Sequence, residues 1–256
     1  MGASLALKDS IKAALLAAVV AALLASVWHQ VLSVPLFDRP ARVDTAVDAS
    51  MNGLARAGGL TGRTSEALGL VLYGVTWALV LGGVFGFAQR RLSDGSQGRR
   101  ATLLVLAAGW AVSILPFLCY PHSPPGVGDV AIVQARQWWY FATIVLATLG
   151  AIGALLVGRR LRTRPANSWS WRNAWRIALV DYALVSLLLL MLLPSRDFAA
   201  PAAPALVVGF QLIAFIGLLV FWIAFALLFG MLVKHWSIRE QEPASGADGS
   251  GTQVAG

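Results

Sequence analysis

The sequence predicts an all-α integral membrane protein, a bundle of about six transmembrane helices with both termini in the cytoplasm. Of its 256 residues, 58% are hydrophobic and only 12% are charged, which is far more apolar than a soluble domain. The apolar residues form runs of roughly twenty, the length that crosses a ~30 Å hydrocarbon core as a helix. Helices are the expected form, because hydrocarbon offers backbone groups no hydrogen-bond partners.

The apolar runs differ in length and setting along the chain. The first follows Lys8 and Lys12 as in a signal peptide, but it is longer than the ~7–15 apolar residues of a signal sequence, so we interpret it as a retained helix. The third is short and ends near Pro116, and the last would be ~43 Å long and should tilt. The six predicted spans are Ile11–Val34, Ala67–Ala88, Ala101–Leu118, Trp138–Gly158, Trp175–Leu193 and Ala205–Val233.

Small residues four apart occur in the second and fourth spans. These pairs are Gly82 with Gly86, and Gly150 with Ala154. Small residues at this spacing lie on one face of a helix and let another helix approach closely. We therefore predict that both pairs mark helix–helix contacts.

The distribution of basic residues predicts the orientation. With the N-terminus inside, the cytoplasmic segments hold 14 Lys and Arg residues and the outer segments hold 6. Cytoplasmic loops carry this excess in membrane proteins. The net charge of +8 is thereby explained without a nucleic-acid partner. The chain also has no Walker lysine motif, no H-E-x-x-H and no nucleophile elbow, so we do not expect an enzyme.

Little of the chain is expected to lie outside the membrane. Residues 1–240 form a single polytopic membrane domain in this interpretation, and the polar, Gly- and Ser-rich residues 241–256 are predicted to be a disordered cytoplasmic tail. The longest outer loop is Pro35–Glu66. Within it, Val43–Ala57 is predicted to form a short helix over the outer mouth.

A second outer loop contains several residue types that bind metals. The stretch "FLCYPHSPPGVGD" offers the thiol of Cys119, the imidazole of His122 and the carboxylate of Asp129, a set that suits divalent first-row metals. His29, near the outer end of the first span, could approach the same face. The alternative is an ordinary turn: a lone C-x-x-H lacks a second ligand pair, Asp129 caps a helix, and His29 hydrogen-bonds to a neighbouring helix.

The fifth span holds a carboxylate within the membrane, Asp181. Such residues are costly enough to suggest a role, either carrying a cation or proton near the inner exit or accepting a hydrogen bond from Gln211 or another helix. Arg176 lies five residues earlier, which turns a helix by about 500°. The two side chains therefore should not share a face or form a simple pair.

The segment "ILPFLCYPHSPPGVGD", followed by "RQWWYFATIVLATLG", resembles the CbtA-type probable cobalt transporter subunit family. Its members carry a similar P-F-L-x-Y-P-x-x-P-P-x-V-G signature. Cys119 and His122 stand where that signature varies, so the resemblance supports the loop and not the ligands. The matching residues are Pro116, Phe117, Leu118, Tyr120, Pro121, Pro124, Pro125, Val127 and Gly128, with Gly126 between them.

The resemblance implies a function and a partner. It implies a multi-pass protein of the bacterial cytoplasmic membrane that takes up Co(II) for cobalamin synthesis, beside a small single-span subunit bearing histidines. Cobalt would be the transported ion, and no permanently bound cofactor is expected. The competing hypothesis is a non-transporting membrane scaffold or assembly protein, in which the glycines serve only packing.

Overall fold

The computed structural model describes residues 6–37, 60–89, 96–121, 130–165, 172–193 and 204–239. These residues are helical apart from short turns, and six helical stretches are long and apolar enough to cross a membrane, which confirms the predicted spans. The helices are α1 (Leu7–Phe37), α3 (Leu60–Gln89), α4 (Gln97–Gly109), the π-helical segment η1 (Trp110–Ile114), α5 (Leu115–Cys119), α6 (Val130–Arg162), α8 (Ala174–Leu192) and α9 (Pro204–Arg239).

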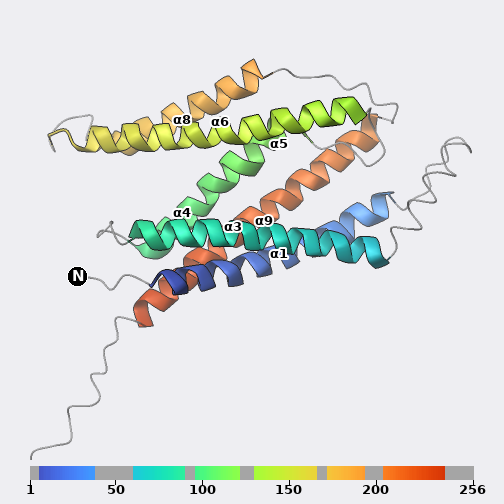
Figure 1. Cartoon of the computed structure of the whole chain (residues 1–256), viewed down its shortest axis with the longest axis horizontal. Coiled ribbons are helices and arrows are strands. Elements are labelled where there is room, and N and C mark those ends of the chain that lie inside the picture. The colour runs from blue at the N-terminus through green and yellow to red at the C-terminus, as the bar shows by residue number, and fades with distance from the viewer. Residues whose placement is uncertain are drawn as a thin grey trace, which may run out of the picture.

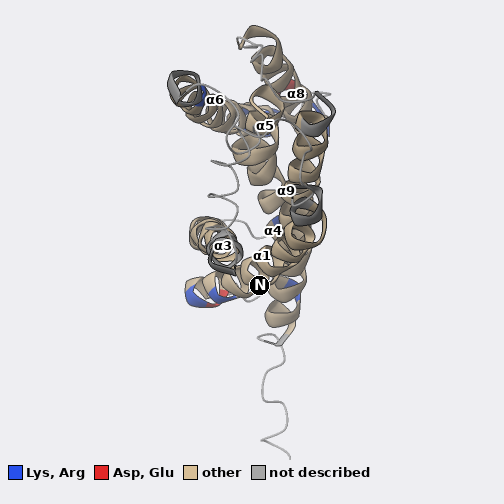
Figure 2. Ribbon diagram, turned by 90° about the vertical axis from the view of Figure 1, so that its right-hand side faces the viewer, with Lys and Arg blue, Asp and Glu red and all other residues tan. Residues whose placement is uncertain are grey.

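The helices are arranged in three levels. In Figures 1 and 2, α1 and α3 lie at the bottom, α4–α5 and α9 cross the middle, and α6 and α8 lie at the top. α1 packs on both α3 and α9, and α4 packs on α9. α6 and α8 pack on each other and meet the rest of the molecule chiefly through η1 and α5. The third span, α4–η1–α5, therefore joins the two parts of the bundle.

An alanine-rich α1 lets α3 approach closely. Ala14 and its small neighbours on α1 are buried, so little side-chain volume separates the two helices. A Cβ atom added at Gly82 would lie only 2.9 Å from the Cβ of Ala14, and one at Gly86 would lie 2.7 Å from Leu7 Cδ1. Larger residues would push the helices apart. The predicted packing role of Gly82 and Gly86 is confirmed.

The other predicted pair packs between α6 and α8. A Cβ at Gly150 would lie 2.7 Å from Val185 Cγ1 of α8, and Ala154 is buried. This prediction is also confirmed. Away from that contact, α8 exposes large apolar side chains along most of its length, as expected of a helix that faces lipid.

Basic side chains gather at one end of the bundle. The starts of α1, α4 and α8 and the ends of α3, α6 and α9 lie at the left in Figure 1, and the opposite helix ends lie toward the right. Every Lys and Arg whose side chain the structure describes belongs to the left-hand end, apart from Arg136 near the start of α6. We call it the basic end. The start of α1 and the end of α9 both lie at the basic end, because a chain with six spans begins and ends on the same side.

Several predictions fall outside the described residues. They are the short helix at Val43–Ala57, the tail at 241–256 and most of the proline-rich loop, residues 122–129.

Candidate functional site

The third span is interrupted by a π-helical segment immediately before a proline. Within η1, the N–H of Leu115 donates to the carbonyl of Trp110, five residues earlier. Pro116 follows and has no N–H, so it cannot donate the next helical hydrogen bond. The helix nevertheless continues to Cys119, one residue beyond the predicted end of the span at Leu118. π segments of this kind occur frequently at functional sites.

Side chains of η1 reach helices on both sides of it. The hydroxyls of Ser113 and Tyr73 of α3 lie 2.6 Å apart, within hydrogen-bonding distance. Trp110 Nε1 donates to Ser186 Oγ of α8 at 3.2 Å, and Ser186 Oγ donates in turn to the carbonyl of Tyr182 at 2.9 Å. The interrupted segment is therefore tied by polar contacts to both parts of the bundle.

Aromatic rings enclose the Tyr73 side of this connection. The Tyr73 ring centroid lies 5.4 Å from that of Phe221, and 6.3 Å from those of Trp77 and Trp222. Trp222 also covers Gly109, where an added Cβ would lie 2.6 Å from its ring. Ser113 itself is 1% exposed. The Tyr73–Ser113 hydrogen bond is thus formed away from the surface, where its loss would not be offset by water.

The first residues of the signature close the helix and fill the core. Tyr120 leaves the helical conformation, and its N–H donates to the carbonyl of Pro116 at 2.8 Å. The Phe117 ring packs against Phe215 of α9, with centroids 5.5 Å apart. Phe117 and Tyr120 are buried, and Pro121 is partly buried. These signature residues hold the C-terminal end of α5 against its neighbours.

The predicted metal ligands are only partly described. Cys119 is half-buried at the end of α5, whereas His122 and Asp129 lie outside the described residues, as do Pro124, Pro125, Gly126 and Gly128. Across the part of the chain that is described, no three His, Cys, Asp or Glu side chains gather as a metal site would require. Whether the loop completes a site with Cys119 stays a prediction.

His29 lies against α9 at a glycine. A Cβ added at Gly217 would lie 2.7 Å from His29 Nε2, and the neighbouring Trp28 Nε1 donates to the carbonyl of Ile213 at 3.2 Å. Phe117 contacts α9 at Phe215, two residues from Gly217. Two residues turn a helix by about 200°, so His29 and Phe117 contact different faces of α9.

Asp181 is half-buried on α8. Arg176 does not pair with it, and the guanidinium carbon of Arg176 lies instead 5.5 Å from the centroid of the Trp175 ring. Within the described residues, no side chain hydrogen-bonds to Asp181, including Gln211. A role for Asp181 in carrying a cation or proton stays a prediction.

Comparison with known proteins matches the chain to a family model. The sequence model of a family described as "Probable cobalt transporter subunit (CbtA)" matches residues 7–234, nearly the whole chain. The chain belongs to the CbtA family. It is accordingly a multi-pass membrane protein of a transporter-subunit family, which is not a class of enzymes. No curated protein and no solved structure matches this CbtA member.

The sequence interpretation missed the polar contacts of η1. A single polar group among apolar neighbours is common in a membrane span, so it carries little signal in the sequence. This applies to Tyr73, Trp110, Ser113 and Ser186. One local signal was present: Ser113 precedes Pro116 by three residues inside a span, and proline within such a helix requires neighbouring polar groups to compensate.

Proposed function

We propose that this CbtA-family chain is the membrane subunit of a cobalt uptake system that admits Co(II) from the extracytoplasmic face for cobalamin synthesis. The observation that carries the proposal is the family match over residues 7–234. The basic end is cytoplasmic in this proposal, since Lys and Arg collect on that side of membranes. The chain resides in the bacterial cytoplasmic membrane.

The ion first meets the proline-rich loop. His122, Cys119 and Asp129 serve as transient ligands, and Pro124 and Pro125 stiffen the loop so that less entropy is lost on binding. What supports this role is the position of Cys119 at the end of α5, where the loop starts. Asp181, with no partner among the described residues, serves as a later station on α8.

The interrupted third span provides the moving part. Because α6 and α8 meet the other helices chiefly through η1 and α5, a bend at the π segment would shift that pair relative to α1, α3 and α9. The Tyr73–Ser113 and Trp110–Ser186 hydrogen bonds hold one arrangement and would be exchanged during the movement.

The family description as a subunit implies a partner in a transport complex. We propose that the partner is a small single-span membrane protein bearing histidines. Co-purification of the tagged chain from its native membrane would identify it. Recovery of the chain without such a protein would contradict this part of the proposal.

Cobalt accumulation tests the function directly. Cells with and without the chain are supplied with nanomolar radiolabelled Co²⁺, and internal label is measured over minutes, with and without a tenfold excess of Ni²⁺. We expect initial uptake to fall severalfold without the chain and to recover on complementation. Equal uptake in both strains, with normal cobalamin content, would favour the competing hypothesis of a scaffold or assembly protein.

A further inference from the structure

The end of α6 carries two arginines that have no acidic partner among the described residues. Arg159 and Arg160 are exposed in the last turns of the helix, at the basic end. Across the described residues, neither guanidinium lies within ion-pairing distance of a carboxylate. Two adjacent uncompensated cations at the edge of a membrane span attract an anion at headgroup depth.

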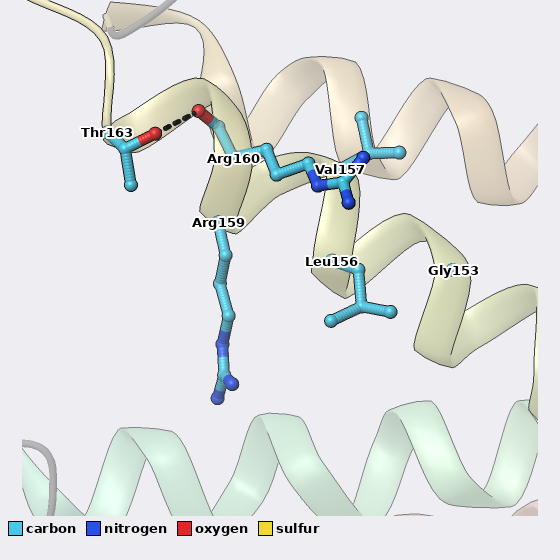
Figure 3. Close-up of a pocket in the computed structure, with 6 residues that line it drawn as sticks. All are labelled: Gly153, Leu156, Val157, Arg159, Arg160 and Thr163. Atoms are coloured by element: carbon cyan, nitrogen blue, oxygen red, sulfur yellow. Dashed lines mark hydrogen bonds between the residues drawn. The ribbon is translucent and has the colours of Figure 1, made fainter.

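These arginines border a hollow of about 380 Å³ along α6. Figure 3 shows Arg160 extending along the helix toward Val157, while Arg159 extends away from it. Thr163 Oγ1 donates to the carbonyl of Arg160 at 2.7 Å, which closes the end of the helix. The lining residues are Gly153, Leu156, Val157, Arg159, Arg160 and Thr163.

The other part of the hollow is apolar and points toward the middle of the span. Gly153 and Leu156 line this part of the hollow. Leu149, which lies outside the hollow, comes four residues before Gly153 and shares the same face of α6, so it extends this surface toward the middle of the span. Both leucines are more than half exposed, at 58% and 53%. A Cβ added at Gly153 would meet nothing within 4 Å, so the helix surface is open there. This face fits a hydrocarbon chain.

We propose that this hollow binds an anionic phospholipid, with its phosphate against Arg159 and Arg160 and one acyl chain along Leu149, Gly153 and Leu156. Charge and shape agree in this assignment, because the cationic part lies at the end of the span and the apolar part lies within it. The C-terminal end of a helix is the negative end of its dipole, so the backbone does not attract a phosphate here. The arginine side chains must supply the attraction.

Lipid retention by the full-length protein tests the proposal. The purified chain is placed in phosphatidylcholine nanodiscs containing 5% phosphatidylglycerol with the same acyl chains, and the enrichment of each lipid after detergent extraction is measured by native mass spectrometry. We expect the R159Q/R160Q variant to lose about 30-fold in relative affinity for phosphatidylglycerol, since each basic residue near a membrane surface contributes about fivefold. The R164Q/R172Q variant removes two basic residues that lie at the same end of the bundle but outside the hollow. Its relative affinity for phosphatidylglycerol should be unchanged.

A second pair of variants tests the apolar part with all charges retained. Gly153→Leu fills the hollow, and Gly83→Leu makes the same change at an equally open position on α3. We expect only Gly153→Leu to reduce retention. It also preserves the test if the arginine variant fails to fold.

Three results would overturn the proposal. Equal losses in the two arginine variants would mean that the basic end attracts lipid by general charge. Unchanged retention in Gly153→Leu would remove the acyl-chain assignment. Displacement of the lipid by equimolar glycerol phosphate would mean that the arginines bind phosphate without the hollow.

Discussion

At the scale of single residues, comparing Tyr73 with Tyr182 shows how much a buried tyrosine hydroxyl contributes to stability through its hydrogen bond, apart from the packing of its ring. Tyr73 shares a hydrogen bond with Ser113, whereas the Tyr182 hydroxyl is buried without a partner among the described residues. Removing the first hydroxyl leaves Ser113 unsatisfied. Removing the Tyr182 hydroxyl breaks no hydrogen bond among the described residues and removes the desolvation cost of burying that group.

We therefore expect Tyr73→Phe to lower the free energy of unfolding by about 1–2 kcal/mol, and Tyr182→Phe to leave it unchanged or to raise it slightly. Denaturant titration in detergent, followed by circular dichroism, measures both. If the two variants unfold alike, the Tyr73–Ser113 hydrogen bond does not stabilise the protein.

A substitution at Asp181 tests whether this carboxylate takes part in transport or has only a structural role. Asp181→Asn keeps the shape of the side chain and removes its charge. Since no described side chain depends on that charge, we expect expression and melting temperature to stay normal while cobalt uptake falls by about tenfold. Normal uptake in Asp181→Asn would remove this residue from the ion path.

At the scale of elements, the sequence predicted each span but not the break within the third. Length and apolar character decide whether a helix crosses a membrane, and both can be read from the chain. The proline that follows the π segment at Trp110–Ile114 can be read from the chain, but the side chains that the segment contacts, such as Tyr73 and Ser186, lie far away in the sequence. Nothing in the local pattern specifies them.

Two adjacent glycines on α3 test how closely that helix must approach α1. A Cβ at Gly82 would lie 2.9 Å from Ala14 Cβ and 3.0 Å from Ile11 Cα, whereas one at Gly83 would meet nothing within 4 Å. We expect Gly82→Leu to lower the free energy of unfolding by about 1–3 kcal/mol, or more if α3 separates from α1. Gly83→Leu should not lower it. Equal effects in denaturant titrations would mean that α1 and α3 do not pack as described.

Two variants of the proline-rich loop distinguish the contribution of its backbone shape from the contribution of its metal ligands. Replacing Pro124 and Pro125 by alanine adds two backbone donors and frees two φ angles, so we expect slower cobalt uptake. His122→Ala leaves the loop's path unchanged and should raise the half-saturating cobalt concentration severalfold if the imidazole is a ligand. Uptake kinetics distinguish the two effects. Normal transport by the double proline variant would make the loop a simple connector.

At the scale of the whole molecule, the arrangement of the helices was beyond the sequence. Glycine pairs predicted that contacts exist at Gly82 and Gly150, but not that α1 would meet the first and α8 the second. The candidate metal residues show the same limit. His29 and Cys119 both lie toward the helix ends away from the basic end, yet His29 lies at Gly217 of α9, opposite the face of α9 that Phe117 contacts. Proximity along a membrane normal does not determine which helices are neighbours.

The orientation of the whole bundle is tested by cysteine labelling in intact cells. Ser96 caps α4 at the basic end, and Ser195 follows α8, whose C-terminal end lies on the opposite side. In a Cys119→Ser background, Ser96→Cys should resist a membrane-impermeant thiol reagent and Ser195→Cys should react, because the basic end faces the cytoplasm in our proposal. Permeabilised cells, in which both should react, provide the control. The reverse pattern would place the basic end outside, and Co(II) admitted at the proline-rich loop would then be leaving the cell.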